Sequence, residues 1–281
     1  MSNKSKKKEI LEANIYVHSF LAKSGEYNKS PHFLPENKQK IREILAQTLP
    51  QKNSNFKSKA IDFGCGTGFM IDLIRDLFDE IHGVDITEEM MSQVDLSSGN
   101  VFLHKSVAEN VPFSNDFFNF AAAYSFMDHL LDYKDFLREV YRVLVPGGIF
   151  FSGLNPNRNF SLAIAEANNF PPLNAIIDRE VIGVLNNGNY YEKNYGINAD
   201  LLEKAEPIKT FNKGFSATEV LDIAKKIGFS SCKVDYEWFL GQGKFMREHS
   251  SSEILFLERY LNECLPVSSS LFKYLRFVFV K

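Results

Sequence analysis

Hydrophobic residues recur along the chain with two different spacings. Between Lys59 and Leu154, short and almost continuous apolar runs alternate with stretches in which apolar residues return every three or four positions. The runs are typical of strands buried on both faces, and the stretches between them are typical of helices. The expected strands are AIDFG, IHGVDI, NVFLHK, FFNFAAAYSF and GIFFSGL, and the expected helices are FMIDLIRDLF, TEEMMSQV and YKDFLREVYRVL. This alternation predicts an α/β fold with a parallel sheet and right-handed crossovers.

The alternation resumes near the C-terminus. Residues 216–281 contain, in order, an expected helix, strand, helix and strand: SATEVLDIAKKIG, SCKVDYEWF, SSEILFLERYL and YLRFVFVK. The last strand needs only a reversal of the chain, so we expect the final two strands to pair antiparallel at the sheet edge. The whole pattern predicts a seven-stranded, mostly parallel sheet with an antiparallel edge strand and helices on both faces.

The regions outside this pattern indicate how the chain is organised. Residues 1–56 hold a tail and two amphipathic helices, which we expect to form a helical lid. Residues 57–154 form the α/β core, and residues 215–281 complete the same domain. Between them, residues 155–214 are rich in Asn, Pro and aromatic side chains and are too long for a plain connection. We therefore expect one domain with an inserted, partly helical cap.

Composition narrows the classes of partner. The 281 residues carry a net charge of −3, so no bulk positive field favours nucleic acid or an anionic membrane. No uncharged apolar stretch approaches the roughly 18 residues that span a bilayer. The three cysteines are too widely spaced for a disulfide framework or a zinc site, which favours a cytoplasmic protein. The basic block KSKKK, residues 4–8, precedes any periodic pattern and is expected to be a frayed, solvated terminus.

A glycine-rich loop joins the first expected strand to the helix after it. AIDFGCGTG, residues 60–68, has glycines at alternate positions. A strand, glycine loop and helix in this order form a site for an anionic or polar small molecule, because backbone N–H groups and the positive helix end face the ligand. A P-loop is excluded because no Lys-Ser or Lys-Thr pair follows Gly68. A dinucleotide fingerprint is disfavoured because Phe69 stands where its third small residue belongs.

Four segments in order resemble the class I S-adenosylmethionine-dependent methyltransferases, in particular the small-molecule, type 11-like members. The segments are AIDFGCGTG, GVDIT, AENVPFSNDFFNFAAAYSFMDHLLD and FLREVYRVLVPGGIFF, and they lie within residues 57–155. The resemblance implies a Rossmann-like fold, S-adenosylmethionine as the methyl donor and S-adenosylhomocysteine as the product. It implies no metal, because the positively charged sulfur already activates the methyl group.

The resemblance also implies which residues meet the methionine part of the cofactor. In the family the glycine loop faces this part, an acid in the first strand reaches the loop backbone and the ammonium group, and the end of the fourth strand lines the same side. The matching positions in this chain are Gly64, Cys65, Gly66, Gly68, Asp62 and Tyr124. We expect the loop to act through the backbone groups of its first three residues. Plain structural packing is the alternative role for Asp62 and Tyr124.

Asp85 is the expected partner of the ribose. It stands about 20 positions after Gly64 at the end of the second strand, where a carboxylate accepts hydrogen bonds from both hydroxyls. The alternative is that Asp85 caps the helix TEEMM, a role for which Thr87 is better placed.

The adenine side of the site departs from the family. Ile86 is expected to offer an apolar face to the base. Many relatives carry an acid just before the adenine loop, whereas this chain has no acid at residues 106–108. Backbone groups around Ala108, or the side chain of Glu109, are expected to replace the missing contact.

Two histidines and a tyrosine are the candidates for the reaction itself. An acceptor hydroxyl benefits from a general base, and histidine is the usual choice near neutral pH. His129 in YSFMDHLLD matches a histidine common in relatives, with a structural histidine as the alternative. Tyr27 and His32 belong to EYNKSPHF, which resembles the segment that folds over the cofactor, with an ordinary surface loop as the alternative. His18, His82, His104 and His249 receive no role.

The acceptor is constrained less closely. The chain lacks the [DN]PP[YF] motif of amino-methylating enzymes that flip bases, so we expect a small-molecule acceptor and no nucleic acid partner. Aromatic residues of the cap line a pocket for it or fill the cap's own core: Phe170, Tyr190, Tyr191, Tyr195, Phe211 and Phe215. A binding or regulatory protein without catalysis is the second hypothesis, because the adenine-loop acid and an unmistakable base are missing. A nicotinamide oxidoreductase is the third.

Overall fold

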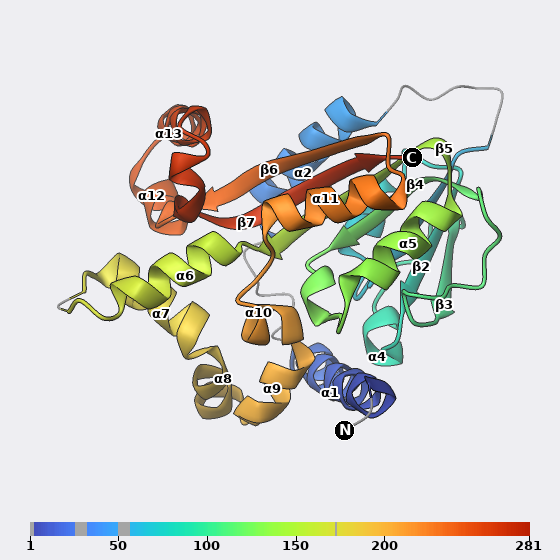
Figure 1. Cartoon of the computed structure of the whole chain (residues 1–281). Coiled ribbons are helices and arrows are strands. Elements are labelled where there is room, and N and C mark those ends of the chain that lie inside the picture. The colour runs from blue at the N-terminus through green and yellow to red at the C-terminus, as the bar shows by residue number, and fades with distance from the viewer. Residues whose placement is uncertain (1–2, 26–32, 50–56, 172) are drawn as a thin grey trace.

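The computed structural model describes residues 3–25, 33–49, 57–171 and 173–281, and it contains a seven-stranded sheet (Figure 1). The strand order is β3-β2-β1-β4-β5-β7-β6. The strands are β1 Lys59–Phe63, β2 Glu80–Asp85, β3 Val101–Lys105, β4 Phe118–Tyr124, β5 Leu144–Pro156, β6 Ser231–Phe239 and β7 Phe272–Val280. The strands β1 to β5 pair in parallel, and β7 lies antiparallel between β5 and β6. The expected α/β fold and the antiparallel pair of final strands are confirmed.

Helices cover both faces of the sheet. α5 Tyr133–Val143 and α11 Ala217–Ile227 pack on one face, and α2 Pro35–Thr48 and α3 Phe69–Ile74 pack on the other. The helix after β2 is shorter than expected, since α4 spans only Glu88–Met91.

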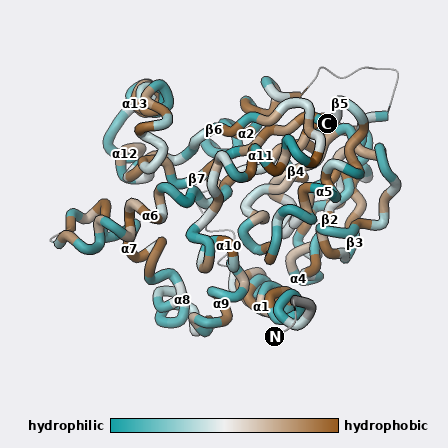
Figure 2. Tube along the Cα trace, in the orientation of Figure 1, coloured by the Kyte–Doolittle hydropathy of each residue, from teal (hydrophilic) through white to brown (hydrophobic). Residues whose placement is uncertain are grey.

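The strand β4 shows why its sequence forms a central strand. Phe120 and Ala122 are buried with α2 and α3, whereas Ala121 and Ala123 are buried with α5 and α11. Alternate residues therefore enter the two halves of the core, which is the two-residue period of a strand. Figure 2 shows the strands at the centre as largely hydrophobic, in contrast to the hydrophilic helix α8 Asn187–Tyr195.

The N-terminal helix begins earlier than expected. α1 spans Asn3–Ser24, so the basic block is helical and is not a frayed terminus. Lys7 within it forms an ion pair with Glu109 at 2.9 Å. Further along α1, Ala13, Val17 and Leu21 are buried against residues of the cap. The helix thus lies between the cap and the α/β core (Figure 1).

The segment after β5 leaves the sheet and returns to the same place. It forms α6 Arg158–Ala167, α7 Ala175–Leu185, α8 Asn187–Tyr195, α9 Ala199–Ala205 and α10 Pro207–Phe211. Its two ends meet where the Phe215 N–H donates to the Pro156 carbonyl at 2.7 Å. The side chains of Asn157, Asn174 and Asn198 accept hydrogen bonds at the N-termini of α6, α7 and α9. Three of the twelve asparagines of residues 155–214 therefore cap helices.

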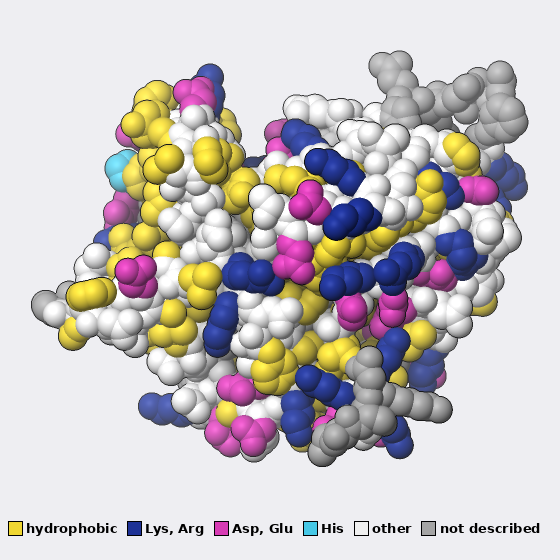
Figure 3. Space-filling view, viewed as in Figure 1, with side chains coloured by type: hydrophobic (Ala, Val, Ile, Leu, Met, Phe, Trp, Pro, Cys, Tyr) yellow, Lys and Arg dark blue, Asp and Glu magenta, His cyan; other side chains and the backbone are white. Residues whose placement is uncertain are grey.

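Two further helices form an arm beside β6 and β7. They are α12 Gln242–Glu248 and α13 Ser251–Glu263, and η4 Val267–Leu271 follows them. No residue of α13 is buried, and Leu255, Phe256 and Tyr260 are exposed on it. Figure 3 shows hydrophobic side chains gathered in this region at the upper left. Among the described residues, no helix is long and apolar enough to cross a membrane.

Candidate cofactor and active site

Two adjoining pockets lie at the carboxyl ends of β1, β2 and β4, where the strand order reverses between β1 and β4. The large pocket holds about 790 Å³ of empty space, open solvent included, and the small pocket about 370 Å³. Gly64 and Ser125 line both. The large pocket is also lined by Lys7, Ile10, Leu11, Asn14, His18, Gly66, Val84, Asp85, Ile86, Thr87, Met90, Ser106, Val107, Ala108, Glu109, Phe126, His129, Leu130 and Leu131. The small pocket is also lined by Phe33, Asp62, Cys65, Thr67, Phe69, Met70 and Tyr124.

The N–H groups of the glycine loop are engaged within the protein. The N–H groups of Gly64 and Cys65 donate to the Val84 carbonyl, at 2.8 and 3.1 Å, and the N–H of Gly66 donates to Asp85 at 2.9 Å. The expectation that these N–H groups face a ligand is therefore wrong. No described residue donates to the carbonyl oxygens of Gly64 and Gly66. Gly68 lines neither pocket. It has a left-handed φ of 92° and stands immediately before α3.

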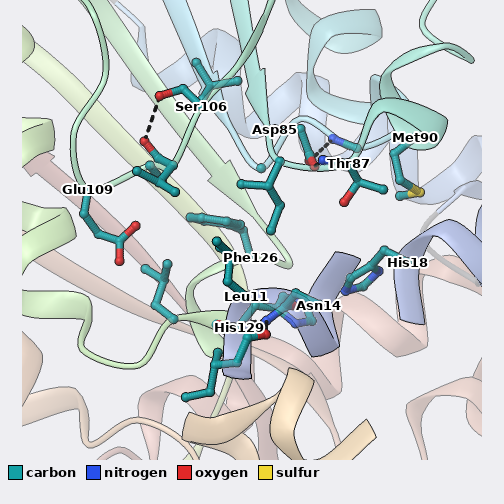
Figure 4. A pocket seen from close by; sticks show the side chains of 18 of the residues that line it. Leu11, Asn14, His18, Asp85, Thr87, Met90, Ser106, Glu109, Phe126 and His129 are labelled. Atoms are coloured by element: carbon teal, nitrogen blue, oxygen red, sulfur yellow. Dashed lines mark hydrogen bonds between the residues drawn. The ribbon is translucent and has the colours of Figure 1, made fainter. Parts of the chain in front are cut away.

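Asp85 is fixed by two backbone groups at the edge of the large pocket. Its Oδ2 accepts the Gly66 N–H and its Oδ1 accepts the Thr87 N–H at 2.8 Å (Figure 4). Thr87 precedes α4, but its side chain makes no capping hydrogen bond, so the expectation that Thr87 is the better placed of the two to cap this helix is not met. Burial raises the pKa of Asp85, although the two N–H donors oppose the change. A carboxylate has about four acceptor sites, so ribose hydroxyls would compete for them with the Thr87 hydroxyl and the Ile86 N–H, which also interact with Asp85.

Asp62 lies in the small pocket as a second buried carboxyl group. Its side chain is 2% exposed, and burial followed by the charge of Asp85 raises its pKa well above the usual range. Ionising both carboxyl groups costs free energy unless a cation is present, because burial and the like charge of the other carboxylate both disfavour ionisation. The small pocket therefore suits a positively charged group such as an ammonium.

The adenine side of the large pocket is apolar with one acid at its rim. Ile86 and Ala108 line it as expected. Glu109 also lines it, and its carboxylate is paired with Lys7 of α1. A contact between Glu109 and a base would therefore compete with the ion pair that ties α1 to the core.

Tyr124 closes the small pocket from the sheet side. Its ring stacks on Phe69 with centroids 4.9 Å apart, and it lies so close to the backbone of Gly153 that a side chain there would overlap it. Burial raises the pKa of the Tyr124 phenol above its usual range. Phe69 thus fills space beside the ligand.

We call the side of the large pocket that α1 forms its roof, and this side was not predicted from the sequence. Leu11, Asn14 and His18 project from α1 and face Asp85 and its neighbours across the cavity (Figure 4). Their three- and four-residue spacing places them on one face of a helix, but the pattern alone does not say what that face covers.

Ser125 is a second residue that the sequence did not single out. It lies between the two pockets with a φ of 52°, and its N–H donates to the Gly153 carbonyl at 3.0 Å. Positive φ is uncommon for a non-glycine residue and is concentrated at functional sites.

His129 lies at the inner end of the large pocket. Its Nδ1 is 2.9 Å from the Ala205 carbonyl, and because a carbonyl only accepts, Nδ1 carries the hydrogen. The lone pair of the neutral ring is then at Nε2. The ring of His18 meets it edge-on at 4.8 Å. Burial, followed by the charge of His129, lowers the pKa of His18 to about 3, so His18 is uncharged.

The aromatic residues of the cap do not join this group. The candidates Tyr27 and His32 lie outside the described residues. Phe170 and Phe211 are exposed, and Phe215 is buried in the core. None of the six cap aromatics lines either pocket, and Tyr191 and Tyr195 pack against the cluster shared with α1.

The sheet order, the glycine loop and the carboxylate at the switch point are those of the class I S-adenosylmethionine-dependent methyltransferases. Residues 61–152 match the family described as "Methyltransferase domain", so the chain carries a domain of this class.

Curated relatives agree with this class over part of their length. A Mycolicibacterium smegmatis protein named as an S-adenosylmethionine-dependent methyltransferase is 30% identical over 41% of this chain and 44% of its own. A demethylmenaquinone methyltransferase of Staphylococcus saprophyticus is 28% identical over 52% and 62%. A ubiquinone biosynthesis O-methyltransferase of Pseudomonas entomophila is 28% identical over 45% and 58%. The chain spans about half the length of these relatives.

Solved structures share the fold at low identity. A Thermotoga maritima S-adenosylmethionine-dependent methyltransferase has a TM-score of 0.52 at 21% identity, covering 93% of this chain and 98% of its own. Haemonchus contortus phosphoethanolamine N-methyltransferase 2, bound to S-adenosylhomocysteine, has a TM-score of 0.53 at 16% identity, covering 86% and 52%.

Proposed function

We propose that this protein transfers the methyl group of S-adenosylmethionine to a small-molecule acceptor. The observation that carries the proposal is the pair of acids at the glycine loop, buried Asp62 and half-buried Asp85, together with Gly64 and Gly66, whose carbonyl oxygens accept from no described residue. S-adenosylmethionine has an ammonium group, a sulfonium and a ribose diol. These groups match the carboxylates and carbonyls in charge and in hydrogen-bonding sense.

We assign the parts of the cofactor to residues of the two pockets. Asp62, Gly64 and the ring of Tyr124, which line the small pocket, would hold the methionine end together with the neighbouring Gly66 of the large pocket. Asp85 would accept the ribose hydroxyls, with Ile86 and Ala108 beside the base.

His129 is the proposed general base. When bound, the cofactor supplies a methyl group on a positively charged sulfur, which departs as a neutral thioether. His129 Nε2 would accept the proton of an acceptor hydroxyl or amine as the new bond to the methyl carbon forms. One positive charge is consumed at sulfur and one appears on the imidazole. The charges of the step therefore balance.

The relatives support a small molecule as the acceptor. Two of them are named for the methylation of quinone precursors or for quinone biosynthesis, and one solved structure is of a phosphoethanolamine methyltransferase. The roof formed by α1 favours the same conclusion, because an acceptor must fit beneath Leu11 and Asn14 or reach the small pocket.

Calorimetric titration with S-adenosylmethionine and S-adenosylhomocysteine tests the donor site. We expect both to bind, and the absence of heat with either at high concentration would refute the proposal. Transfer of label from methyl-labelled cofactor to small-molecule fractions of a cell extract tests the reaction. Tight binding without transfer to any fraction would instead favour a regulatory binding protein.

A further inference from the structure

The helix α13 turns one continuous side to solvent. On this side Leu255, Phe256 and Tyr260 are 59%, 65% and 55% exposed. Arg259 and Glu263 are exposed as well, and the spacing of three and four residues among all five places them on one side of the helix. We call these five residues the outer face of α13. Figure 3 shows hydrophobic side chains gathered in this part of the molecule.

The opposite side of α13 is held against the chain. Leu257 and Glu258 are partly buried there, and Glu258 pairs with Lys40 of α2 at 2.7 Å. A capping box of Ser250 and Glu253 fixes the N-terminus of the helix. The outer face is therefore presented by a regular helix that is anchored on its inner side.

Two charges on the outer face have no ion-pair partner in the described part of the chain. Arg259 and Glu263 stand one turn apart, yet neither forms an ion pair with another described residue. Within a helix, an acid placed four residues after a base is the less favourable order for a pair. Glu263 also lies in the last turn, where the helix dipole disfavours a negative charge and where α13 has no basic residue. A cation from another molecule would therefore stabilise Glu263.

A second copy of the chain carries such a cation. When two α13 helices lie antiparallel about a two-fold axis near Leu261, Arg259 of each copy faces Glu263 of the other. A parallel pair would instead place Arg259 beside Arg259 and Glu263 beside Glu263, which is repulsive. The three apolar side chains of the outer face flank these charges, so the same approach removes them from water.

A lipid surface fits the charges of this helix less well. α13 carries three acids, Glu253, Glu258 and Glu263, and one base, Arg259. Helices that lie on anionic membranes are instead rich in Lys and Arg on their polar side. The charges therefore favour a protein surface that offers both signs, and a copy of α13 is such a surface.

We propose that the outer face of α13 is the interface of a homodimer, in which two copies of the helix pack antiparallel and exchange ion pairs between Arg259 and Glu263. The face is only one helix wide, so the dimer forms at high protein concentration and dissociates on dilution. No residue of α13 lines either pocket, so this inference goes beyond the proposed function and does not depend on it.

Sedimentation velocity of the full chain over a range of protein concentrations tests the proposal. The wild-type protein is expected to pass from monomer to dimer as its concentration rises. Phe256→Asp is expected to weaken dimerisation at least ~30-fold, the effect of losing an aromatic hot spot, because each dimer loses two such side chains. Phe170→Asp is the matched control, since Phe170 is 72% exposed in the cap, and it should dimerise as wild type. A wild-type protein that stays monomeric, or a Phe256→Asp variant that dimerises equally well, would overturn the proposal.

Charge reversal tests the antiparallel pairing itself. Arg259→Glu and Glu263→Arg are each expected to weaken dimerisation about 10-fold, because each variant brings like charges together across the interface. An equal mixture of the two variants is expected to recover wild-type dimerisation, since their heterodimer restores both ion pairs. A mixture that associates no better than the separate variants would overturn the pairing of these two residues.

The variants are expected to leave the fold intact. Arg259→Glu changes an exposed side chain, and Glu263→Arg places a base in the last turn, where the helix dipole favours it. Circular dichroism checks the helix content of each variant. Calorimetric titration with S-adenosylhomocysteine should give the wild-type result in every variant. Because dimerisation and cofactor binding are measured separately, failure of this proposal is distinguishable from failure of the proposed function.

Discussion

The ring of Phe126 occupies the space that a side chain at Gly64 would need. Gly64 also has a φ of 66°, which favours glycine. Both requirements arise where the two pockets meet, so the first glycine of the loop has a steric reason to be glycine. We expect Gly64→Ala to weaken binding of S-adenosylhomocysteine at least ~10-fold, on top of roughly 1–2 kcal/mol of lost stability from the left-handed backbone. Calorimetry and thermal unfolding measure the two effects.

Gly99→Ala is the control for the backbone term. Gly99 has a similar φ of 72°, but nothing lies within 4 Å of the added methyl group. Its variant should lose stability without losing affinity. Equal affinity in the Gly64→Ala and wild-type proteins would show that Phe126 yields easily and that the close contact is unimportant.

Asp85→Ala should weaken both S-adenosylmethionine and S-adenosylhomocysteine by about 1.5 to 3 kcal/mol, the scale of hydrogen bonds to a charged group. The loss includes the anchoring of Gly66 and Thr87, whose N–H groups Asp85 accepts. Asp85→Asn keeps one acceptor oxygen and should lose less. Asp95→Ala, at an exposed ion pair with Arg75, should bind as wild type in calorimetry. Unchanged affinity in Asp85→Ala would remove this residue from the ribose site.

Asp62 should couple stability to pH in the empty protein. Because its pKa is raised in the folded state, the folded protein holds a proton that the unfolded chain releases. The free energy of unfolding should therefore fall as pH rises from the usual aspartate pKa through the raised value. Asp62→Asn should make this fall smaller and stabilise the empty protein above that range, while Asp85, whose pKa is also raised, continues to contribute. Chemical denaturation across pH measures it.

For cofactor binding, Asp62 should produce a pH dependence of the opposite sign to that of stability. An ammonium group favours the carboxylate, so binding should release a proton from Asp62, and affinity should rise with pH through this window. Calorimetry in buffers of different ionisation enthalpy detects the release. A variant Asp62→Asn that bound as tightly as wild type, with the same proton count, would contradict the role assigned here.

Glu89 should govern how fast the cofactor leaves. It accepts a hydrogen bond from Ser19 and pairs with Lys23, and both of these lie on the helix that roofs the large pocket. Glu89→Gln should speed dissociation of S-adenosylhomocysteine a few-fold, and the difference should shrink at high salt because the pair is exposed. Stopped-flow displacement measures the rate. Glu88→Gln, which loses only a pair with Lys105, should leave it unchanged.

The parts of the site that were predictable are those encoded locally. Asp62, Gly64 and Asp85 belong to strand ends and loops within a continuous pattern, so their positions follow from the order of strands in the sheet. Leu11, Asn14 and His18 were missed because the docking of α1 is decided by contacts with the cap, far away in the sequence.

The cap shows a different kind of limit. We assigned its asparagines no role from the sequence, yet Asn157, Asn174 and Asn198 serve helix N-termini. An asparagine immediately before a helical pattern indicates an N-cap, so this role could have been predicted from the sequence. Likewise, Lys7 was read as part of a solvated tail because the sequence does not show that Glu109 lies within its reach.

The direction of the peptide groups in the glycine loop decides what the protein excludes. Since the N–H groups of Gly64, Cys65 and Gly66 are already engaged, a phosphate arriving here would find these three donors occupied and would meet the acids Asp62 and Asp85. ATP shares the adenosine part of the cofactor, but its triphosphate would be repelled at the position where an ammonium is favoured. The loop should thereby select against ATP.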